Sequence, residues 1–389
     1  MTANDSYNIG GASADVHLRS IVYIDPSDRS FKLKNANTSQ IILSSPNAVT
    51  VLQKAFDTLP EGGLVSIKNG TYPIVSNNLQ IPNTNNITIE GDEIGVQPVL
   101  DARNIRITDP RTEKPVERYD QLGVLSRSSE DNSRAANLPQ IKGLTIRNLS
   151  ILSFQTGKLY LENKFAPHGI RTDNVNNLII ENISTQGCGI SIQSFNVSSG
   201  IISACRSTSD AAGPTISTNC KNILVQNCYT FGSFDDSFAC LGTKGTTNIT
   251  WLNCIADKGI DAPPTVGASC FKLDAGGIVG GVSGIKYLGC YALNAKPGRG
   301  DIQGGFINGD PKGVSNIMYE NCSAINCNMG MKVAGTQISA SNCIFQDCNT
   351  ALVTEVNSPG ATFKNVRFVR NANNTNFLTP AQVISPIYN

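Results

Sequence analysis

The sequence predicts an all-β fold, a right-handed, single-stranded parallel β-helix with three sheets per coil and an N-terminal capping helix. The first indication is a phrase that recurs along the chain: two to four β-forming residues, then Asn, then a small apolar residue. Self-similarity with a period of twenty-odd residues is typical of a solenoid. The copies are 144–149 (LTIRNL), 178–183 (LIIENI), 223–228 (ILVQNC), 249–254 (ITWLNC), 317–322 (IMYENC), 338–343 (ISASNC) and 361–366 (ATFKNV).

The spacing of the recurring Asn is the second indication. Counted from Asn148 to Asn365, with Gly289 in place of one Asn, the spacings are 34, 45, 26, 36, 32, 21 and 23 residues. The shortest spacings fit one bare coil of three short strands, so the excess measures loops inserted at the turns. We therefore predict insertions at 92–140, 183–222 and 254–285 that build a binding groove on one face. Asn suits the turn after each strand because it tolerates the left-handed conformation.

The chain ends are assigned separately. Residues 1–45 lack the repeat and are predicted to form a loosely attached N-terminal extension. The β-helix is predicted over 46–370 and a C-terminal tail over 371–389. A capping helix is predicted at 46–59, because an open solenoid end must be covered.

Within the predicted capping helix, the apolar residues recur with helical spacing. Pro46 at the first helical position and Ser45 before it predict the start of the helix. One face collects the residues Val49, Leu52, Ala55, Phe56 and Leu59.

Composition excludes several classes of function. The 389 residues carry a formal net charge of +1, and only 16% of them are charged. A general electrostatic hold on nucleic acid or on an anionic membrane is therefore not expected. The chain has no apolar run of about 18 residues that would span a membrane. Its opening residues are polar and do not resemble a signal peptide.

All 12 cysteines lie after residue 187. Five of them directly follow the recurring Asn, or Gly289 in its place, in the slot that Leu149, Ile183 and Val366 fill in other copies. Cysteine in such a slot behaves as a small buried hydrophobic residue. We therefore predict a ladder of free, inward-facing thiols rather than disulfides. With only two histidines and no CxxC motif, a zinc site has little support.

Candidate chemistry gathers between residues 205 and 275. Asp235 and Asp236 are adjacent carboxylates on a predicted turn, which repel each other unless a cation lies between them. Asp210 lies in the preceding long coil, and the three carboxylates together offer oxygen ligands for Ca²⁺. Lys272 follows one coil later between two apolar residues. A partly desolvated lysine near cations has a lowered pKa and can act as a base.

The same stretch resembles the central part of family 9 polysaccharide lyases, which are pectate lyases of the parallel β-helix type. The matching pieces are 228–239 (CYTFGSFDDSFA), 248–254 (NITWLNC) and 269–277 (SCFKLDAGG). The resemblance covers about 80 residues. It implies calcium ligation by Asp235 and Asp236, with Asp210 as a further ligand, and Lys272 as the base. The implied reaction is calcium-assisted β-elimination on a uronate-containing polysaccharide.

The sequence also departs from this family. Ala239 stands where the family has the last Asp of its motif, which removes one implied calcium ligand, and Ser237 replaces Gly. Three basic residues in nearby loops are candidates for binding an acidic sugar. They are Lys244, Lys296 and Arg299.

Two other functions stay open. One is a glycoside hydrolase resembling polygalacturonases, which would use Asp235 and Asp236 as its carboxylate pair with Asp173 as a possible third. Against it, the Gly-His-Gly and Arg-Ile-Lys motifs of that family are absent. The other is a non-catalytic, glycan-binding β-helix on a cell or virion surface, for which a trimer would add support. The expected partner is an acidic polysaccharide, and the expected location is extracellular or on a virion or cell surface.

Overall fold

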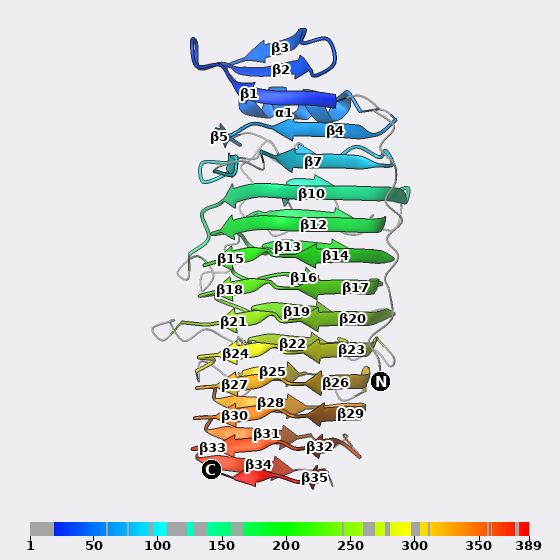
Figure 1. Cartoon of the computed structure of the whole chain (residues 1–389), viewed down its shortest axis with the longest axis vertical. Helices are drawn as coiled ribbons and strands as arrows, with labels where there is room; N and C mark the ends of the chain where they lie inside the picture. Colours follow the sequence, from blue (N-terminus) through cyan, green and yellow to red (C-terminus); the bar gives the residue numbers. More distant parts are fainter. Residues whose placement is uncertain are drawn as a thin grey trace.

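The computed structural model of the chain describes most of the predicted β-helix. The described residues are 19–59, 61–75, 78–92, 96–106, 123–127, 138–156, 159, 166–242, 245–259, 269–276, 281–296, 304–309, 312–355, 358, 360–377 and 381–388. Among them the strands stack as successive coils along one long axis (Figure 1). The structure confirms the predicted parallel β-helix, because strands one coil apart pair in parallel along three separate ladders.

The first ladder contains the strands that carry the recurring Asn at their ends. Its members are β4 (Gly63–Ile67), β7 (Ile87–Gly91), β10 (Ile141–Leu152), β12 (Val175–Gln186), β14 (Ser199–Ser203), β17 (Lys221–Gln226), β20 (Thr246–Leu252), β23 (Val282–Leu288), β26 (Val314–Glu320), β29 (Thr336–Ser341), β32 (Thr362–Lys364) and β35 (Gln382–Ile384).

The second ladder follows the turn at the end of each first-ladder strand. The long strands β10 and β12 run through both ladders. Its other members are β5 (Thr71–Pro73), β8 (Val99–Asp101), β15 (Arg206–Thr208), β18 (Tyr229–Phe231), β21 (Ile255–Asp257), β24 (Tyr291–Leu293), β27 (Ser323–Ile325), β30 (Ile344–Gln346), β33 (Arg367–Val369) and β36 (Ile387–Tyr388).

The third ladder completes each coil and carries the candidate site. Its members are β6 (Leu79–Gln80), β9 (Gly123–Arg127), β11 (His168–Asp173), β13 (Ile192–Phe195), β16 (Thr215–Ile216), β19 (Phe238–Leu241), β22 (Phe271–Asp274), β25 (Gly304–Asn308), β28 (Met329–Val333), β31 (Thr350–Thr354) and β34 (Asn373–Phe377).

The N-terminal residues form a cap that continues the β-helix. Strands β1 (Arg19–Ile24), β2 (Phe31–Asn35) and β3 (Ile41–Ser45) form an antiparallel sheet, and β1 also pairs in parallel with the first-ladder strand β4. The described part of the predicted extension is therefore hydrogen-bonded to the first coil rather than loosely attached. At the other end, β34, β35 and β36 continue the three ladders beyond residue 370, through the predicted tail.

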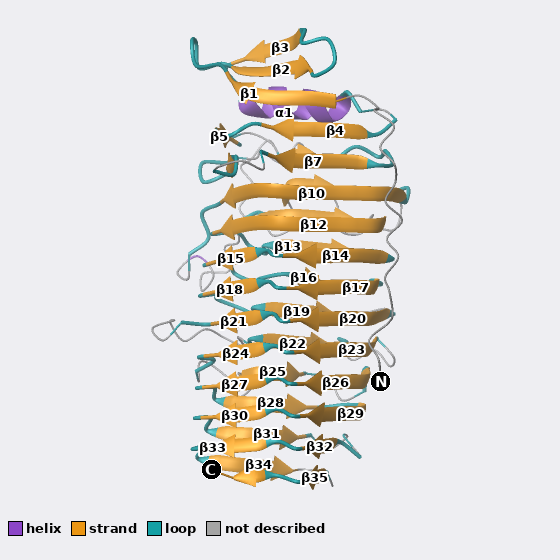
Figure 2. Cartoon of the chain, in the orientation of Figure 1, coloured by secondary structure: helices purple, strands orange, loops and turns teal. Residues whose placement is uncertain are grey.

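Helix α1 (Ala48–Asp57) lies beneath this N-terminal sheet (Figure 2). The predicted apolar face is confirmed, since all five of its residues are buried. The predicted start was wrong by two residues. Asn47 is the N-cap, and its side chain accepts hydrogen bonds from the backbone N–H groups of Val49 and Thr50. Ser45 lies two residues before Asn47, and its hydroxyl accepts a hydrogen bond from the backbone N–H of Asn47 instead.

The recurring Asn residues adopt the predicted left-handed turn. Asn182, Asn253 and Asn342, for example, have φ values of 51°, 51° and 55°. Side chains in successive coils also hydrogen-bond to each other, as Asn182 Nδ2 does to Asn148 Oδ1 at 2.9 Å. One spacing was misinterpreted, however. The 45 residues between two Asn copies contain a whole additional coil, β14 to β16, in which Ala204 has the left-handed φ of 51°. Residues 183–222 are therefore mainly a coil and not an inserted loop.

Replacing Asn342 with alanine should lower the free energy of unfolding by about 1–2 kcal/mol, because L-residues that lack the local hydrogen bonds of an Asn side chain disfavour the left-handed conformation by roughly that much. Asn342 also accepts a hydrogen bond from Asn365 Nδ2 at 3.3 Å. Glycine adopts this conformation freely, so Asn342→Gly should retain most of the stability. Urea denaturation of both variants measures the difference. Equal losses would contradict the backbone explanation.

The interior is filled by stacked side chains, as strand alternation requires. Phe238, Phe271 and Phe306 stack along the third ladder with ring centroids 5.0 and 4.8 Å apart. Trp251 and Tyr287 stack opposite them along the first ladder. All 12 cysteines are buried and free, which confirms the predicted thiol ladder. Because Phe271 points inward, the next residue in β22 points outward, and that residue is the predicted base, Lys272.

Candidate functional site

The candidate site is the turn that connects β18 in the second ladder to β19 in the third. Gly232, with a φ of 64°, lets the chain leave β18. The turn then lies directly on the equivalent turn of the preceding coil. The backbone N–H of Phe234 donates to the carbonyl of Asp210 at 3.1 Å, and that of Asp235 donates to the carbonyl of Ala211. These bonds hold Asp235 and Asp236 at the edge of the third ladder.

Asp236 is a buried carboxyl group held by two neighbours. Only 5% of the residue is exposed. Its Oδ1 accepts a hydrogen bond from the backbone N–H of Ser269 at 3.0 Å, and its Oδ2 lies 3.4 Å from Nζ of Lys272. Burial, together with the charge of half-buried Asp235, raises the pKa of Asp236 to about 7, although the nearby lysines oppose the shift. This carboxyl group can therefore hold a proton near neutral pH.

Lys272 extends from the outer face of the third ladder, as predicted. It pairs in register with Ala239 on β19 and with Ile307 on β25, and 24% of its side chain is exposed. The predicted pKa direction, however, is reversed. The charge of Asp236 raises the pKa of Lys272 above its ordinary value, with smaller contributions from Asp235 and Asp274, and burial does not offset this effect. Lys272 is therefore protonated in this arrangement.

A second lysine, which the sequence analysis missed, lies beneath the same turn. Lys258 follows β21 and is only 4% exposed. Its ammonium group donates hydrogen bonds to the backbone carbonyls of Asp235 and, at 3.4 Å, of Ser233. Burial lowers the pKa of Lys258, although Asp236 and Asp235 favour its charged form. Two lysines thus balance the charges of the two aspartates in this turn.

Asp210 does not belong to this outer cluster, which corrects the prediction made from its sequence position. The residue is fully buried. Its carboxylate accepts hydrogen bonds from the hydroxyl groups of Thr185 and Ser207, at 2.5 and 2.6 Å, and from the backbone N–H of Cys188 at 2.7 Å. The strand register explains this orientation, because Asp210 occupies a column that faces inward in other coils. Buried residues in that column include Cys188, Ser233, Ala295, Cys327 and Cys348.

Asp210→Asn should raise the unfolding temperature at pH 8 and leave it nearly unchanged at pH 4. Burial raises the pKa of Asp210 from 3.8 to about 6. Its stabilising contribution is therefore complete below pH 3.8 and is lost as the pH rises through 6. The amide cannot ionise, so the gain at pH 8 should be about 1–2 kcal/mol. Thermal melts at both pH values test this. Exposed Asp347→Asn is the control, and a similar gain there would contradict the assignment to burial.

The structure does not bring the three predicted calcium ligands together on the outer face. Asp210 faces inward, and both oxygens of Asp236 are engaged by protein groups. Ala239 supplies no oxygen at the adjacent outer position. Within the described residues, no three His, Cys, Asp or Glu side chains come together in a way that could hold a metal ion. Calcium binding therefore stays a prediction, and the observed positions of these side chains do not favour it.

The other predicted site residues are spread around the same region or lie elsewhere. Lys296 is exposed at the equivalent turn two coils after Asp235. Lys244 and Arg299 lie outside the described residues. Asp173 lies at the far end of β11, fully buried, where its Oδ1 accepts a hydrogen bond from Asn196 at 2.8 Å. It is therefore not a third member of the Asp235–Asp236 pair.

Comparison with known proteins supports the fold. No family model and no curated protein matches the chain, so the predicted membership of the family 9 lyases stays a prediction. Among solved structures, the catalytic domain of a GH87 alpha-1,3-glucanase in complex with nigerose has a TM-score of 0.55 at 15% identity, covering 86% of this chain and 67% of that one.

A viral protein, ORF18 of Geobacillus virus E2, also has a similar structure, with a TM-score of 0.52 at 11% identity. This match covers 91% of the present chain and 68% of the viral one. At such low identity these likenesses show a shared parallel β-helix fold. In addition, no helix in the described part of the chain is long and apolar enough to cross a membrane.

Proposed function

We propose that this protein hydrolyses a polysaccharide, with Asp235 and Asp236 as the catalytic carboxyl pair. The observation that carries the proposal is the burial of the Asp236 carboxyl group directly beside half-buried Asp235. A buried carboxyl group with a pKa of about 7 can donate a proton to a leaving glycosidic oxygen near neutral pH. Hydrolysis needs a second carboxyl group to activate water or to attack the sugar. Half-buried Asp235, the adjacent residue, is the candidate for this role.

The similar structures support this choice. They include complexes of aspartate-to-alanine variants of the GH87 alpha-1,3-glucanase with sugars, two variants at adjacent positions and a third about two dozen residues earlier. Asp235 and Asp236 are likewise adjacent, and Asp210 precedes them by a comparable stretch. In this chain Asp210 faces inward, so its proposed role is to support the turn from inside rather than to contact substrate. A polysaccharide substrate also fits a location outside the cell or on a virion.

A lyase is the second candidate, because Lys272 lies on the outer face beside the two aspartates. For this reaction Lys272 would have to lose its proton before it could remove one from the sugar. Its raised pKa works against that step in the present arrangement. The proposal that calcium assists such a reaction would require Asp236 to exchange its protein partners for the ion.

One assay separates these functions. The protein is incubated with a neutral alpha-1,3-glucan and with polygalacturonate, while reducing ends and the ultraviolet absorbance of unsaturated uronides are both measured. We expect new reducing ends without absorbance. A rise in absorbance would overturn hydrolysis in favour of β-elimination. If neither signal appears on either polymer, the proposed catalysis is wrong and a glycan-binding protein, as the viral similarity allows, is the better description.

A further inference from the structure

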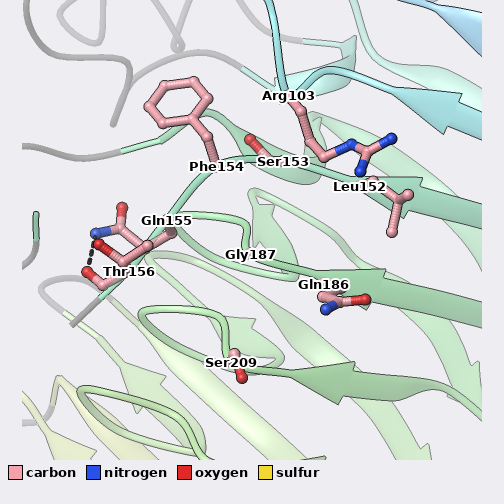
Figure 3. Close-up of a pocket in the computed structure, with 9 residues that line it drawn as sticks. All are labelled: Arg103, Leu152, Ser153, Phe154, Gln155, Thr156, Gln186, Gly187 and Ser209. Atoms are coloured by element: carbon pink, nitrogen blue, oxygen red, sulfur yellow. Dashed lines mark hydrogen bonds between the residues drawn. The ribbon is translucent and has the colours of Figure 1, made fainter.

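A small pocket opens on the same side of the β-helix as the Asp235–Asp236 turn. It has a volume of about 190 Å³. Residues from four coils line it, with Arg103 and Phe154 above and Ser209 below, as Figure 3 shows. Gly187, with a φ of 68°, forms part of the floor, where an added Cβ would lie 2.7 Å from the carbonyl oxygen of Ser153. An added side chain at this position would therefore clash with the backbone of the adjacent coil, which also lines the pocket.

The polar groups of the pocket point to a hydroxylated ligand. Half-buried Ser209 places a hydroxyl side chain at the lower edge of the pocket. A hydroxyl group at the surface of a pocket can donate a hydrogen bond to a ligand hydroxyl and accept one from it. Gln186, at the exposed end of β12, adds an amide that can donate and accept at the pocket mouth. The Phe154 side chain adds an apolar surface.

The charge of the pocket favours a neutral ligand. Among the described residues that line it, Arg103 is the one that carries a charge, and that guanidinium already pairs with Asp101. Nε donates to Oδ1 at 2.9 Å and one terminal nitrogen donates to Oδ2 at 2.7 Å. This pairing uses two of the five N–H donors of the guanidinium, and the Asp101 charge balances the positive charge that would otherwise attract a carboxylate. The expected preference is therefore for sugar hydroxyls rather than for a uronate carboxylate.

Size and position connect the pocket with the candidate site. Drug-sized ligands occupy pockets of about 300–1,000 Å³, so this smaller pocket suits one sugar ring. Ser209 at its lower edge belongs to the turn on which the Asp235 turn is stacked. The pocket centre, near Gly187, is thus two coils from Asp235, or about 10 Å at the spacing of paired strands. A short oligosaccharide lying along the axis spans that distance.

We propose that this pocket is a subsite for one ring of a neutral glycan, which would extend from it towards Asp235. This inference rests on the proposed polysaccharide function and specifies its substrate class. It replaces the acidic polymer that the sequence suggested with a neutral one. Ser209 and Gln186 would hydrogen-bond the sugar hydroxyls, and Phe154 would contact the apolar face of the ring.

Calorimetric titration tests the subsite without requiring turnover. The full-length Asp236→Asn protein is titrated with an alpha-1,3-linked gluco-oligosaccharide and with an oligogalacturonide of equal length. The same titrations are repeated after adding Gln186→Trp, which fills the pocket from an exposed strand position. The matched control is Gln346→Trp, because Gln346 lies in the same register column six coils further along. Unchanged melting temperatures confirm that both variants fold.

We expect the neutral oligosaccharide to bind more tightly than the oligogalacturonide. Gln186→Trp should weaken this binding at least tenfold, and Gln346→Trp should not. Tighter binding of the oligogalacturonide would overturn the neutral preference, and equal weakening by the two tryptophan variants would overturn the location. Absence of binding by either probe would overturn the subsite altogether. Calorimetry measures binding without catalysis. A failure of the hydrolysis assay can therefore be distinguished from a failure of the proposed subsite.

Discussion

Replacing Asp236 with asparagine should lower the rate of polysaccharide hydrolysis by about 10²- to 10⁴-fold, the usual contribution of a positioned general acid. The amide is nearly the same size as the carboxyl group and can still accept the hydrogen bond from the backbone N–H of Ser269. It cannot transfer a proton to the glycosidic oxygen. The loss should therefore appear in kcat rather than in stability, and the release of reducing ends by wild type and variant measures it.

The pH dependence sharpens this expectation. In the wild-type protein, activity should fall as the pH rises through about 7, because Asp236 then loses the proton that it must donate. The residual activity of Asp236→Asn should not show this decline as the pH rises. Asp347→Asn, at an exposed turn far along the second ladder, is the matched control and should retain full activity. An Asp236→Asn protein that hydrolyses glycan at the wild-type rate would exclude Asp236 as the acid.

The fold was predictable because its repeating element is short and local. Each strand ends in a residue that must adopt the left-handed turn, and Asn marks that position in the sequence. The coil over β14 to β16 was missed because Ala204 replaces Asn there. The N-terminal cap was missed for a different reason: β1 to β3 are antiparallel and carry no repeat. The pairing of β1 with β4 depends on contacts between distant segments, which a periodic pattern does not reveal.

The site was predicted only in part, and the register explains the difference. Asp235, Asp236 and Lys272 do come together at one edge of the third ladder. Asp210 does not, although the sequence contained the necessary signal. It lies five residues after Cys205, where other coils have Cys327 after Cys322 and Cys348 after Cys343. A position that is cysteine in other coils faces the interior. Counting five residues from Cys205, as in the other coils, would have placed the Asp210 side chain in the interior of the β-helix.

Lys258 was missed because nothing in its sequence neighbourhood distinguishes it from a solvated lysine. Its coil position matches Ser209, Gly232 and Asn294, which are turn residues with left-handed φ values. Only the folded chain shows that the Asp235–Asp236 turn closes over its ammonium group. This contact makes Lys258 a positioning residue for Asp235 and Asp236.

Lys258→Met should destabilise the protein by about 3–5 kcal/mol at pH 8, the typical result of removing one partner from a buried charge cluster. Methionine fills a similar volume, but it leaves the carbonyls of Ser233 and Asp235 without their donor. It also removes a positive charge that lowers the pKa of Asp236, so that pKa should rise further above 7. The pH above which hydrolysis declines should move upward accordingly.

The stability loss of Lys258→Met should itself depend on pH, and this separates the charge from the hydrogen bonds. At pH 5 Asp236 is largely protonated, so the missing ammonium leaves a smaller uncompensated charge and the loss should shrink. Urea denaturation at pH 5 and pH 8 measures both values. The control is Lys286→Met on the exposed face of β23, expected to change stability by less than about 0.5 kcal/mol. A loss of equal size at both pH values would show that the carbonyl contacts alone hold the turn, and the pH limit of hydrolysis would then stay where it is in the wild type.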